Sequence, residues 1–261
     1  MKHIGKSYDK VDAKGILSGK PSYTGDFVPK DALIIKVLRS PHAQAKIKSI
    51  DTSKAKLIPG VEAIFTYEDV PNTRFTLAGQ TYPEPSAYDA LILDSVVRYV
   101  GDEVALVVAK DEATALKAMP LIKVEYEVQK PVLDLHTAMD HETVVHPEDD
   151  ILNHIPVGQD YKRNICVSYH KSVGDIEAEL AKCDYVVEGT YFDQATRQSA
   201  MEPFQSFGYI DHLGRIVIVS STQIVFHVRR HIARALGIPA SKIRVIKPRI
   251  GGGFGSKQTA C

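Results

Sequence analysis

Short apolar runs separated by polar breaks fill residues 27–132, and their lengths are those of strands. Residues 45–51 alternate apolar and polar side chains, which is the pattern of a half-buried strand. Residues 103–109 form a β-branched run that is typical of a buried strand. Comparable runs predict further strands at 32–38, 61–66, 95–99 and 121–128, and short helices at 51–55 and 111–119. The pattern therefore predicts a compact α+β domain over residues 27–132.

Polar, irregular sequence flanks this domain on both sides. Residues 1–26 are rich in Gly, Ser and Lys, and they predict an extended lead-in on the surface. Residues 133–164 include His136, His141, His146 and His154. Their separations of five, five and eight residues match no helical or hairpin metal-ligand set, and no cysteine lies among them. A solvated linker between two domains is the favoured interpretation.

Residues 165–261 predict a second domain that is again a mixture of strands and helices. Strands are predicted at 165–170 and 185–192, with a helix at 174–182 between them. Residues 204–210 and 215–220 predict a hairpin, because Asp211-His212-Leu213-Gly214 has the composition of a hairpin turn.

The last part of the chain predicts a strand, a helix and a second strand at 216–219, 224–236 and 243–246. If the two strands are parallel, their carboxyl ends emerge at one edge of the sheet. Gln223 and Gly253-Phe254-Gly255 would then share one crevice. A buried amide and exposed backbone N–H groups can bind an oxo group or polarise a carbonyl, but they offer neither a nucleophile nor a general base.

The glycine-rich stretch Gly251–Gln258 fits neither common nucleotide-binding loop. A phosphate-binding P-loop needs Ser or Thr directly after its lysine, but Gln258 follows Lys257. The dinucleotide fingerprint needs a final glycine, and starting from Gly251 that place is taken by Ser256. The loop therefore indicates close backbone approach to some other group.

Other polar residues near the loop have simpler interpretations. His227 and His231 have the i, i+4 spacing of a zinc pair, but Val228 stands where a metalloprotease has glutamate, so surface or interface histidines are favoured. Glu202 is either a catalytic acid or a structural carboxylate, and the structural role is favoured. The remaining candidates form a basic flank expected to face solvent or another subunit: Arg229, Arg230 and Arg234.

Composition narrows the class of protein. Hydrophobic residues make up 44% and charged residues 25%, as in an ordinary soluble globular protein. Lys+Arg 32 balances Asp+Glu 32, so no general attraction to nucleic acid or membrane is expected. The sequence has no apolar run of about 18 residues and no signal-peptide pattern at its start. The cysteines Cys166, Cys183 and Cys261 form no CxxC pair, suit a reducing cytoplasm, and are expected to be small buried residues.

Several motifs, taken together, resemble the molybdenum-binding large subunit of the xanthine dehydrogenase/aldehyde oxidase family. The motifs occur in family order along nearly the whole chain. Those resembling its a/b hammerhead domain are Gly19–Asp26, Arg39–Ala43, Pro59–Val61, Val100–Ala105, and Tyr126-Glu127 before Pro131-Val132. Those resembling the start of its molybdopterin-binding domain are Ala200–Pro203, Ser221–Gln223, Ala235–Pro239 and Gly251–Lys257.

The resemblance implies hydroxylation of a heterocycle or aldehyde with water-derived oxygen at a molybdopterin cofactor, with iron–sulfur clusters and FAD on partner subunits. Gln223 matches the glutamine that hydrogen-bonds a molybdenum oxo ligand. Gly253, Phe254 and Gly255 match the loop beside the molybdenum centre, which no protein side chain ligates. Gln258 stands where purine-oxidising eukaryotic members carry a substrate-contacting glutamate, so purines, nicotinate-like heterocycles and aldehydes all stay open.

The family carries its substrate-binding arginine and its general-base glutamate further along the subunit, beyond the glycine loop. We therefore expect no catalytic general base in these residues, inactivity of the chain alone, and a further polypeptide that supplies the rest of the molybdopterin domain. The alternative is a noncatalytic truncated scaffold or interaction module. A large exposed apolar patch over residues 200–261 would favour a missing partner, and a closed surface would favour an independent module.

Overall fold

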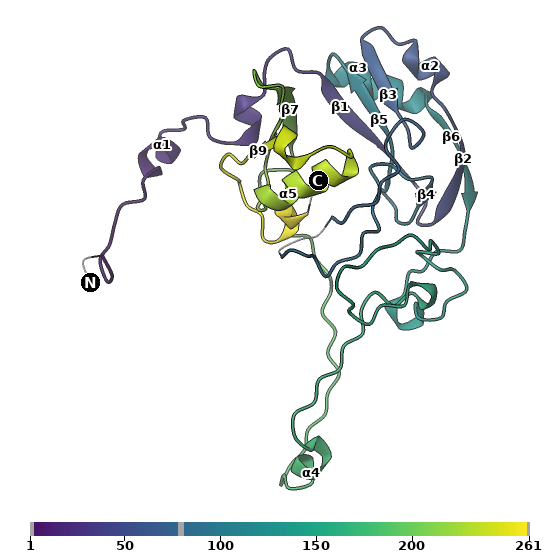
Figure 1. Ribbon diagram of the computed structural model, residues 1–261, viewed down its shortest axis with the longest axis vertical. Helices are drawn as coiled ribbons and strands as arrows, with labels where there is room; N and C mark the ends of the chain where they lie inside the picture. The colour runs from purple at the N-terminus through teal and green to yellow at the C-terminus, as the bar shows by residue number, and fades with distance from the viewer. Residues whose placement is uncertain (1–2, 78–80, 260–261) are drawn as a thin grey trace. The chain divides into compact units, whose positions relative to one another are not determined.

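The computed structural model describes residues 3–77 and 81–259, which form two compact units (Figure 1). One unit consists of residues 34–199, and the other joins residues 3–33 to residues 200–259. Both contain helices and strands, which confirms the α+β class. The domain boundaries after residues 26, 132 and 164 stay predictions.

Two antiparallel sheets of three strands form the framework of residues 34–199. The first sheet has the order β1-β5-β3, and the second has the order β4-β2-β6. Every strand overlaps the apolar run that predicts it. Their bounds are β1 Ile34–Arg39, β2 Ala45–Asp51, β3 Val61–Phe65, β4 Val96–Val97, β5 Glu103–Ala109 and β6 Lys123–Val128.

Helices α2 (Ser53–Lys56) and α3 (Glu112–Ala118) pack on the first sheet. Ala115 of α3 is fully buried in one cluster with Val107 of β5. The Asp111 carboxylate caps α3 by accepting a hydrogen bond from the Thr114 N–H at 2.7 Å. Short 3-10 turns are Thr24–Phe27, Met119–Leu121, Leu135–Thr137, Tyr161–Arg163, Ala240–Lys242 and Ser256–Gln258.

A bulge in β2 interrupts the alternation that predicts this strand. Ala45 and Ile47 are buried, as the pattern requires. The pairing with β6 then shifts between Ile47 and Ser49, so Lys48 and Ser49 are both exposed. Ile50 returns to the interior and packs against the cores of both sheets.

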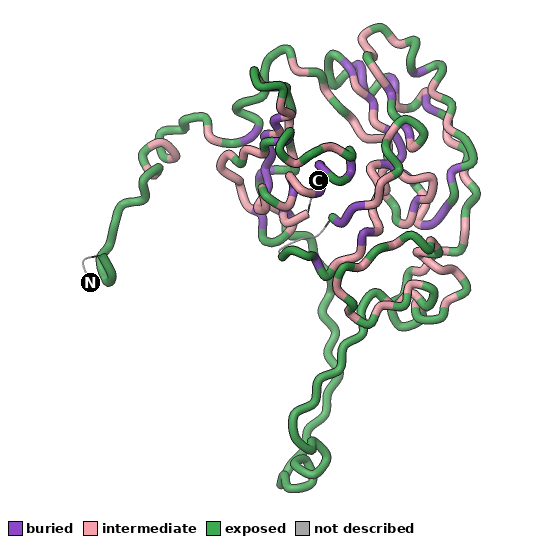
Figure 2. Tube along the Cα trace, in the orientation of Figure 1, coloured by how far each residue is buried: buried purple, intermediate pink, exposed green. Residues whose placement is uncertain are grey.

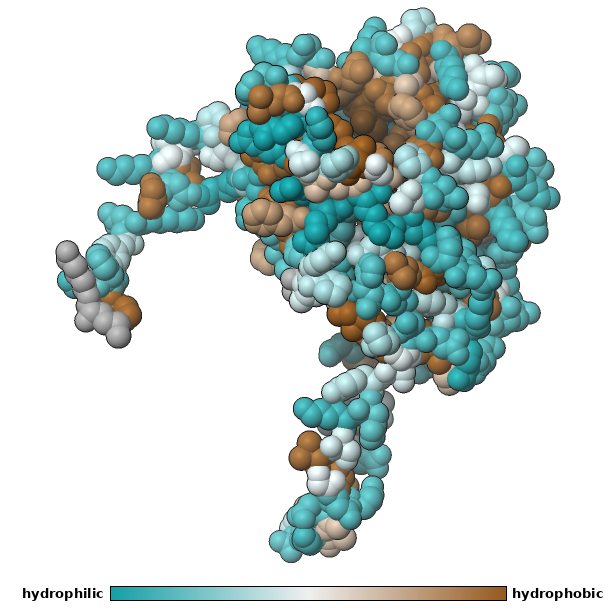
Figure 3. All heavy atoms as spheres, viewed as in Figure 1, coloured by the Kyte–Doolittle hydropathy of each residue, from teal (hydrophilic) through white to brown (hydrophobic). Residues whose placement is uncertain are grey.

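The second face of the β1-β5-β3 sheet is apolar and only partly covered. Cross-strand pairing places six apolar side chains on this face: Ile35, Val37, Ala63, Phe65, Leu106 and Val108. Ile35 is 58% exposed and Phe65 39%, whereas the opposite face holds the buried core. Figure 3 shows hydrophobic side chains gathered over these strands.

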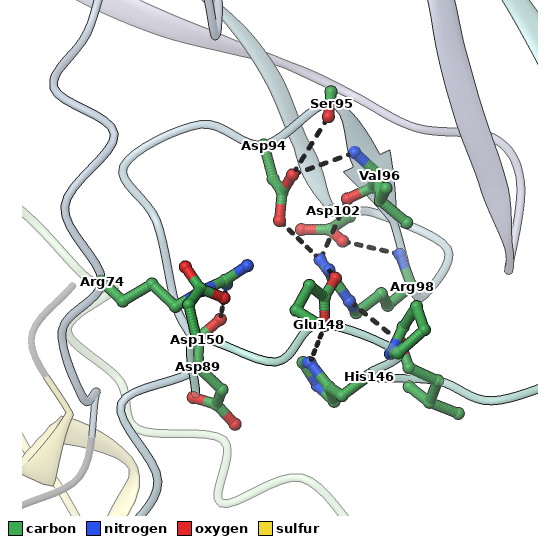
Figure 4. Close-up of polar contacts among 12 residues, drawn as sticks. Arg74, Asp89, Asp94, Ser95, Val96, Arg98, Asp102, His146, Glu148 and Asp150 are labelled. Atoms are coloured by element: carbon green, nitrogen blue, oxygen red, sulfur yellow. Dashed lines mark hydrogen bonds and ion pairs between the residues drawn. The ribbon is translucent and has the colours of Figure 1, made fainter. Parts of the chain in front are cut away.

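Two arginines anchor residues 133–164 to the rest of the same unit (Figure 4). Arg98 forms ion pairs with Asp94 at 2.8 Å and with Glu148. Arg74 pairs with Asp150 at 2.7 Å. Both arginine side chains are only 11% exposed. Glu148 and Asp150 thus pair with nearly buried cations, while the segment itself contains no buried residue. Its role as a linker between two domains stays a prediction.

Three of the four histidines in this segment have structural contacts. The ring of His154 packs edge-on against Tyr88, with 4.7 Å between centroids. Nδ1 of His146 lies 3.5 Å from Oε2 of Glu148, and His141 accepts a backbone N–H from two residues further on. Among the residues that the structure describes, no group of three or more His, Cys, Asp or Glu side chains is placed to hold a metal ion.

Residues 165–199 disagree with the prediction. The predicted strands at 165–170 and 185–192 are extended chain that pairs with no strand of the described residues, apart from a single bridge at Ile165. Between them, helix α4 (Ile176–Leu180) forms as predicted and is capped by Asp175. Figure 2 shows the segment as exposed. A strand without a neighbour leaves its backbone groups and side chains in solvent, whatever its intrinsic preference.

The cysteine prediction is corrected in this segment. Cys166 and Cys183 are both free and exposed, so the prediction that they are small buried residues is wrong. Cys261 lies outside the described residues.

A three-stranded sheet of order β7-β8-β9 forms the centre of the other unit. The predicted hairpin is confirmed: β7 (Ser206–Ile210) and β8 (Ile216–Ser220) are antiparallel, and the Asp211 side chain closes the turn by accepting from the backbone N–H groups of Leu213 and Arg215. The lead-in contains a short helix, α1 (Ala13–Leu17), that the sequence pattern does not predict.

The lead-in also packs on this unit. The Arg249 N–H donates to the carbonyl of Ser22 at 3.0 Å, and Tyr23 forms a parallel bridge with Arg249.

Across the described residues of the whole chain, every helix is too short or too polar to cross a bilayer.

Candidate functional site

The strand–helix–strand unit at the end of the chain is confirmed. Helix α5 (Val225–Ala235) connects β8 to β9 (Ile243–Ile246), and the two strands are parallel, with Ile216 paired to Ile243 and Val219 to Ile246. Their carboxyl ends therefore emerge at one edge of the sheet. Gln223 follows β8, and the glycine loop Gly251–Lys257 follows β9.

Gln223 and the glycine loop are in contact at this edge. The Gln223 N–H donates to the carbonyl of Lys257 at 2.9 Å. A Cβ atom added to Gly253 would lie 2.5 Å from Oε1 and 2.8 Å from Cδ of Gln223. Any side chain at position 253 would therefore collide with the Gln223 amide, so glycine is required there for close approach.

The Gln223 amide oxygen is the unsatisfied atom of the site. Oε1 is buried and has no hydrogen-bond partner among the described residues. A buried amide oxygen without a partner is unfavourable by about 1–3 kcal/mol, so such atoms usually face a water or a ligand. The amide carries both an acceptor and a donor group, and can therefore bond an oxygen of a bound group.

The tip of the loop adopts left-handed backbone conformations. Phe254 has φ +48°, which is rare for an aromatic residue, and its side chain is 73% exposed. Gly252 and Gly255 have φ +99° and +89°. The hydroxyl of Ser256 donates to the carbonyl of Gly253 at 2.6 Å and closes the turn. Strained residues of this kind gather at ligand-binding sites, where the surrounding structure holds them in place.

Glu202 is a buried structural carboxylate at the base of the loop. Its Oε2 accepts hydrogen bonds from the hydroxyl of Ser221 at 2.6 Å and from the Gly251 N–H at 2.7 Å, and it pairs with Lys257 at 3.0 Å. Burial raises the pKa of Glu202, but these hydrogen bonds outweigh it and lower the pKa to about 2. An ionised carboxylate with its donors in place is no proton donor at neutral pH, which supports the structural interpretation.

The structure corrects part of the prediction for the histidines and arginines of α5. His231 is buried, at 3% exposed, on the same helix face as Val228, so it is not a surface histidine. A guanidinium nitrogen of Arg230 lies 2.6 Å from Nδ1 of His227. Arg229 donates to the carbonyl of Ala240 at 2.9 Å, so the basic flank also packs within the unit.

Sequence reasoning missed Lys257, which is 1% exposed and is the buried partner of Glu202. No pattern in the sequence marks this lysine, because its burial follows from the carboxylate of Glu202, which is distant in sequence. Gln258 lies next to it, in the 3-10 turn Ser256–Gln258, and its N–H donates to the carbonyl of Gly255 at 3.1 Å.

Two families of known proteins match this chain. The family described as the a/b hammerhead domain of aldehyde oxidase and xanthine dehydrogenase matches residues 18–130, and the molybdopterin cofactor-binding domain matches residues 157–261. Over 98% of its length the chain is 41% identical to the probable hypoxanthine oxidase XdhD of Escherichia coli strain K12. Over 95% it is 36% identical to the putative xanthine dehydrogenase molybdenum-binding subunit XdhA of the same strain.

Among solved structures, quinoline 2-oxidoreductase from Pseudomonas putida 86 is similar, with a TM-score of 0.80 and 29% identity over 97% of this chain. The matches cover 29%, 32% and 31% of these three proteins, so the chain spans less than a third of the length of each.

The matches to the hammerhead domain and to the molybdopterin cofactor-binding domain define the class of protein as molybdopterin-binding. The chain belongs to the molybdenum-binding subunits of the xanthine dehydrogenase and aldehyde oxidase family.

Proposed function

We propose that Gln223 and Gly253–Gly255 form part of the molybdopterin site of a molybdenum hydroxylase that acts on a purine or another N-heterocycle. The observation that carries this proposal is the buried, unpartnered amide oxygen of Gln223 over a glycine that tolerates no side chain. A group with oxygen ligands would give the Gln223 amide its missing hydrogen bond, and Gly253 keeps the space for it.

The residues of the loop have separate tasks in this proposal. When bound, the molybdenum cofactor supplies the two-electron oxidation that accompanies hydroxylation with water-derived oxygen. Gln223 orients an oxygen ligand of that group through its amide. The backbone of Phe254 and Gly255 would lie against it, and the Phe254 side chain, which is 73% exposed, would be available to cover it.

The substrate class is an N-heterocycle, with Gln258 as a substrate-binding residue. Two of the relatives carry the names hypoxanthine oxidase and quinoline 2-oxidoreductase, and hypoxanthine and quinoline are both N-heterocycles. A glutamine amide offers a donor and an acceptor to ring nitrogens and exocyclic oxygens. Nicotinate-type heterocycles and aldehydes are the alternative substrates.

The proposal requires other polypeptides, which would act together with this chain in the cytoplasm. Iron–sulfur and FAD subunits would receive the electrons, and further polypeptide would complete the molybdopterin domain and supply the general base. Exposed apolar side chains of residues 200–259, among them Met201 at 96%, Phe226 at 71% and Phe254 at 73%, support such a covering partner. We therefore expect no turnover from these 261 residues alone.

The decisive experiment purifies the full chain with the subunits that its host assembles and measures molybdenum and pterin per chain. We expect about one of each, loss of most of both in Gln223→Ala and Gly253→Val, and oxidation of hypoxanthine or another N-heterocycle in preference to an aldehyde. Gln258→Ala should raise KM more than it lowers kcat. A complete complex that holds neither molybdenum nor pterin would support the noncatalytic scaffold instead.

A further inference from the structure

A single carboxylate oxygen joins three segments at the base of the glycine loop. Oε2 of Glu202 accepts from the Ser221 hydroxyl at the end of β8, from the Gly251 N–H at the start of the loop, and from the Lys257 ammonium at its end. The other oxygen, Oε1, accepts from the side-chain amide of Gln205 at 3.1 Å. The carboxylate therefore has four donors, and it is 9% exposed.

Both ends of the glycine loop converge on this carboxylate. The backbone of Glu202 adds two contacts: its N–H donates to the carbonyl of Gly251 at 3.1 Å, and its carbonyl accepts from the Lys257 ammonium at 2.9 Å. A Cβ atom on Gly251 would lie 2.6 Å from the Cβ of Glu202, so the two segments are in the closest packing that glycine permits.

The same hydrogen-bond network also includes the backbone of Gln223. The carbonyl of Lys257, whose ammonium Glu202 holds, accepts the backbone N–H of Gln223 at 2.9 Å and the hydroxyl of Thr222 at 3.4 Å. Displacement of Lys257 would therefore move the end of the loop and the Gln223 backbone together.

Stability alone explains this pair poorly. A buried ion pair gains little over apolar residues of the same volume, because both charges lose their hydration. An ion pair with hydrogen bonds restricts geometry, because the ammonium and the carboxylate fit together in only a few orientations. Here the pair restricts the conformation of a loop whose tip holds Phe254 at φ +48°.

We propose that Glu202 and Lys257 are positioning residues that clasp the two ends of the glycine loop and so hold Gln223 and the Phe254–Gly255 backbone in the conformation that receives the cofactor. This inference rests on the proposed function, since it specifies how that same site is held.

The test compares four variants of the full chain, purified with the subunits that its host assembles: Glu202→Gln, Lys257→Met, the double variant, and Asp211→Asn as control. Asp211 is a comparable carboxylate of the same unit, because it too accepts backbone N–H groups, those of Leu213 and Arg215, and pairs with a cation, Arg215 at 2.8 Å, but at the hairpin turn. Three quantities are measured: hydrogen exchange of the loop amides, molybdenum and pterin per chain, and melting temperature.

We expect Glu202→Gln and Lys257→Met to speed exchange of the loop amides about tenfold and to reduce cofactor content about fivefold or more. The double variant should recover much of the melting temperature, since neither charge is then left buried alone, yet cofactor content should stay low. Asp211→Asn should lower the melting temperature and leave both the loop exchange and the cofactor content unchanged.

The inference is overturned if cofactor content follows melting temperature across all four variants, so that the double variant regains both, or if loop exchange is unchanged in Glu202→Gln. A wild-type complex without molybdenum or pterin would contradict the proposed function, and the hydrogen-exchange comparison would still decide whether Glu202 and Lys257 hold the loop.

Discussion

Strand β8 and the segment 185–192 have the same kind of sequence, yet one is core and the other is exposed. Val217 of β8 is fully buried between two neighbouring strands. Val187 lies in extended chain and is 92% exposed. The difference teaches that β-branched residues stabilise this protein only where a neighbouring strand satisfies their backbone and covers their side chains.

Matched substitutions at these two valines should differ most in their effect on stability. Val217→Asp buries a carboxylate without a partner, so we expect a loss of about 4 kcal/mol or more in the free energy of unfolding of its unit. Val187→Asp should change it by less than about 0.5 kcal/mol. Urea unfolding monitored by circular dichroism measures both, and equal effects would show that residues 185–192 are packed in solution.

Acidification should destabilise the packed regions more than the exposed segment, because two carboxylates with strongly lowered pKa values lie in the packed regions. The pKa of Glu202 and that of Glu148 are both lowered to about 2; for Glu148, burial opposes the shift and hydrogen bonds and Arg98 outweigh it. Because the folded pKa lies below the ordinary value, the stability is present above about pH 4.5 and is lost as the pH falls from about 5 to 2. We expect roughly 1–2 kcal/mol per carboxylate.

This pH dependence is measured as the free energy of unfolding between pH 7 and pH 3. Glu202→Gln and Glu148→Gln should each flatten the profile, and Asp184→Asn, an exposed residue of the 165–199 segment, serves as the control. An unchanged slope in both glutamine variants would contradict the assignment of the acid-sensitive stability to these groups.

A pair of glycines provides the next test. Gly253→Ala places Cβ 2.5 Å from the Gln223 amide, so we expect a loss of about 1–3 kcal/mol and a displaced amide. Gly189→Ala also meets a neighbour, at 2.9 Å, but that atom is the hydroxyl of the exposed Tyr191, which can rotate away. Thermal unfolding should therefore register the first variant and not the second.

The smallest expected effect concerns two helix caps. Asp111 caps α3, which packs on the core, and Asp175 caps α4, in which every residue lies outside the core. Asp111→Ala should lower the melting temperature by a few degrees. Asp175→Ala should leave it unchanged and only reduce the helix signal of residues 176–180. A similar fall in both would indicate that α4 is coupled to the folded core.

Local pattern was sufficient where the periodicity of apolar residues or the composition of a turn marks the segment by itself. Strands β2, β5 and β9, the β7–β8 hairpin and helix α5 follow directly from apolar periodicity and turn composition. The pattern failed at residues 165–170 and 185–192, because a strand depends on a partner that periodicity cannot reveal. It also failed for His231 and Cys166, because histidine and cysteine occur both in the core and on the surface of proteins, so the residue type does not fix the burial.

The sequence alone was sufficient for the α+β class and the family motifs. It also predicts that Gln223 meets the glycine loop if β8 and β9 are parallel, because parallel strands joined by a helix end at one edge, and the structure shows that they are parallel. Only the tertiary structure decided that Glu202 meets Lys257, 55 residues away, and that the Gln223 amide oxygen is left buried without a partner among the described residues. The physical reason is that hydrogen bonds between side chains distant in sequence depend on three-dimensional packing, whereas periodicity and turn chemistry are local properties of the chain.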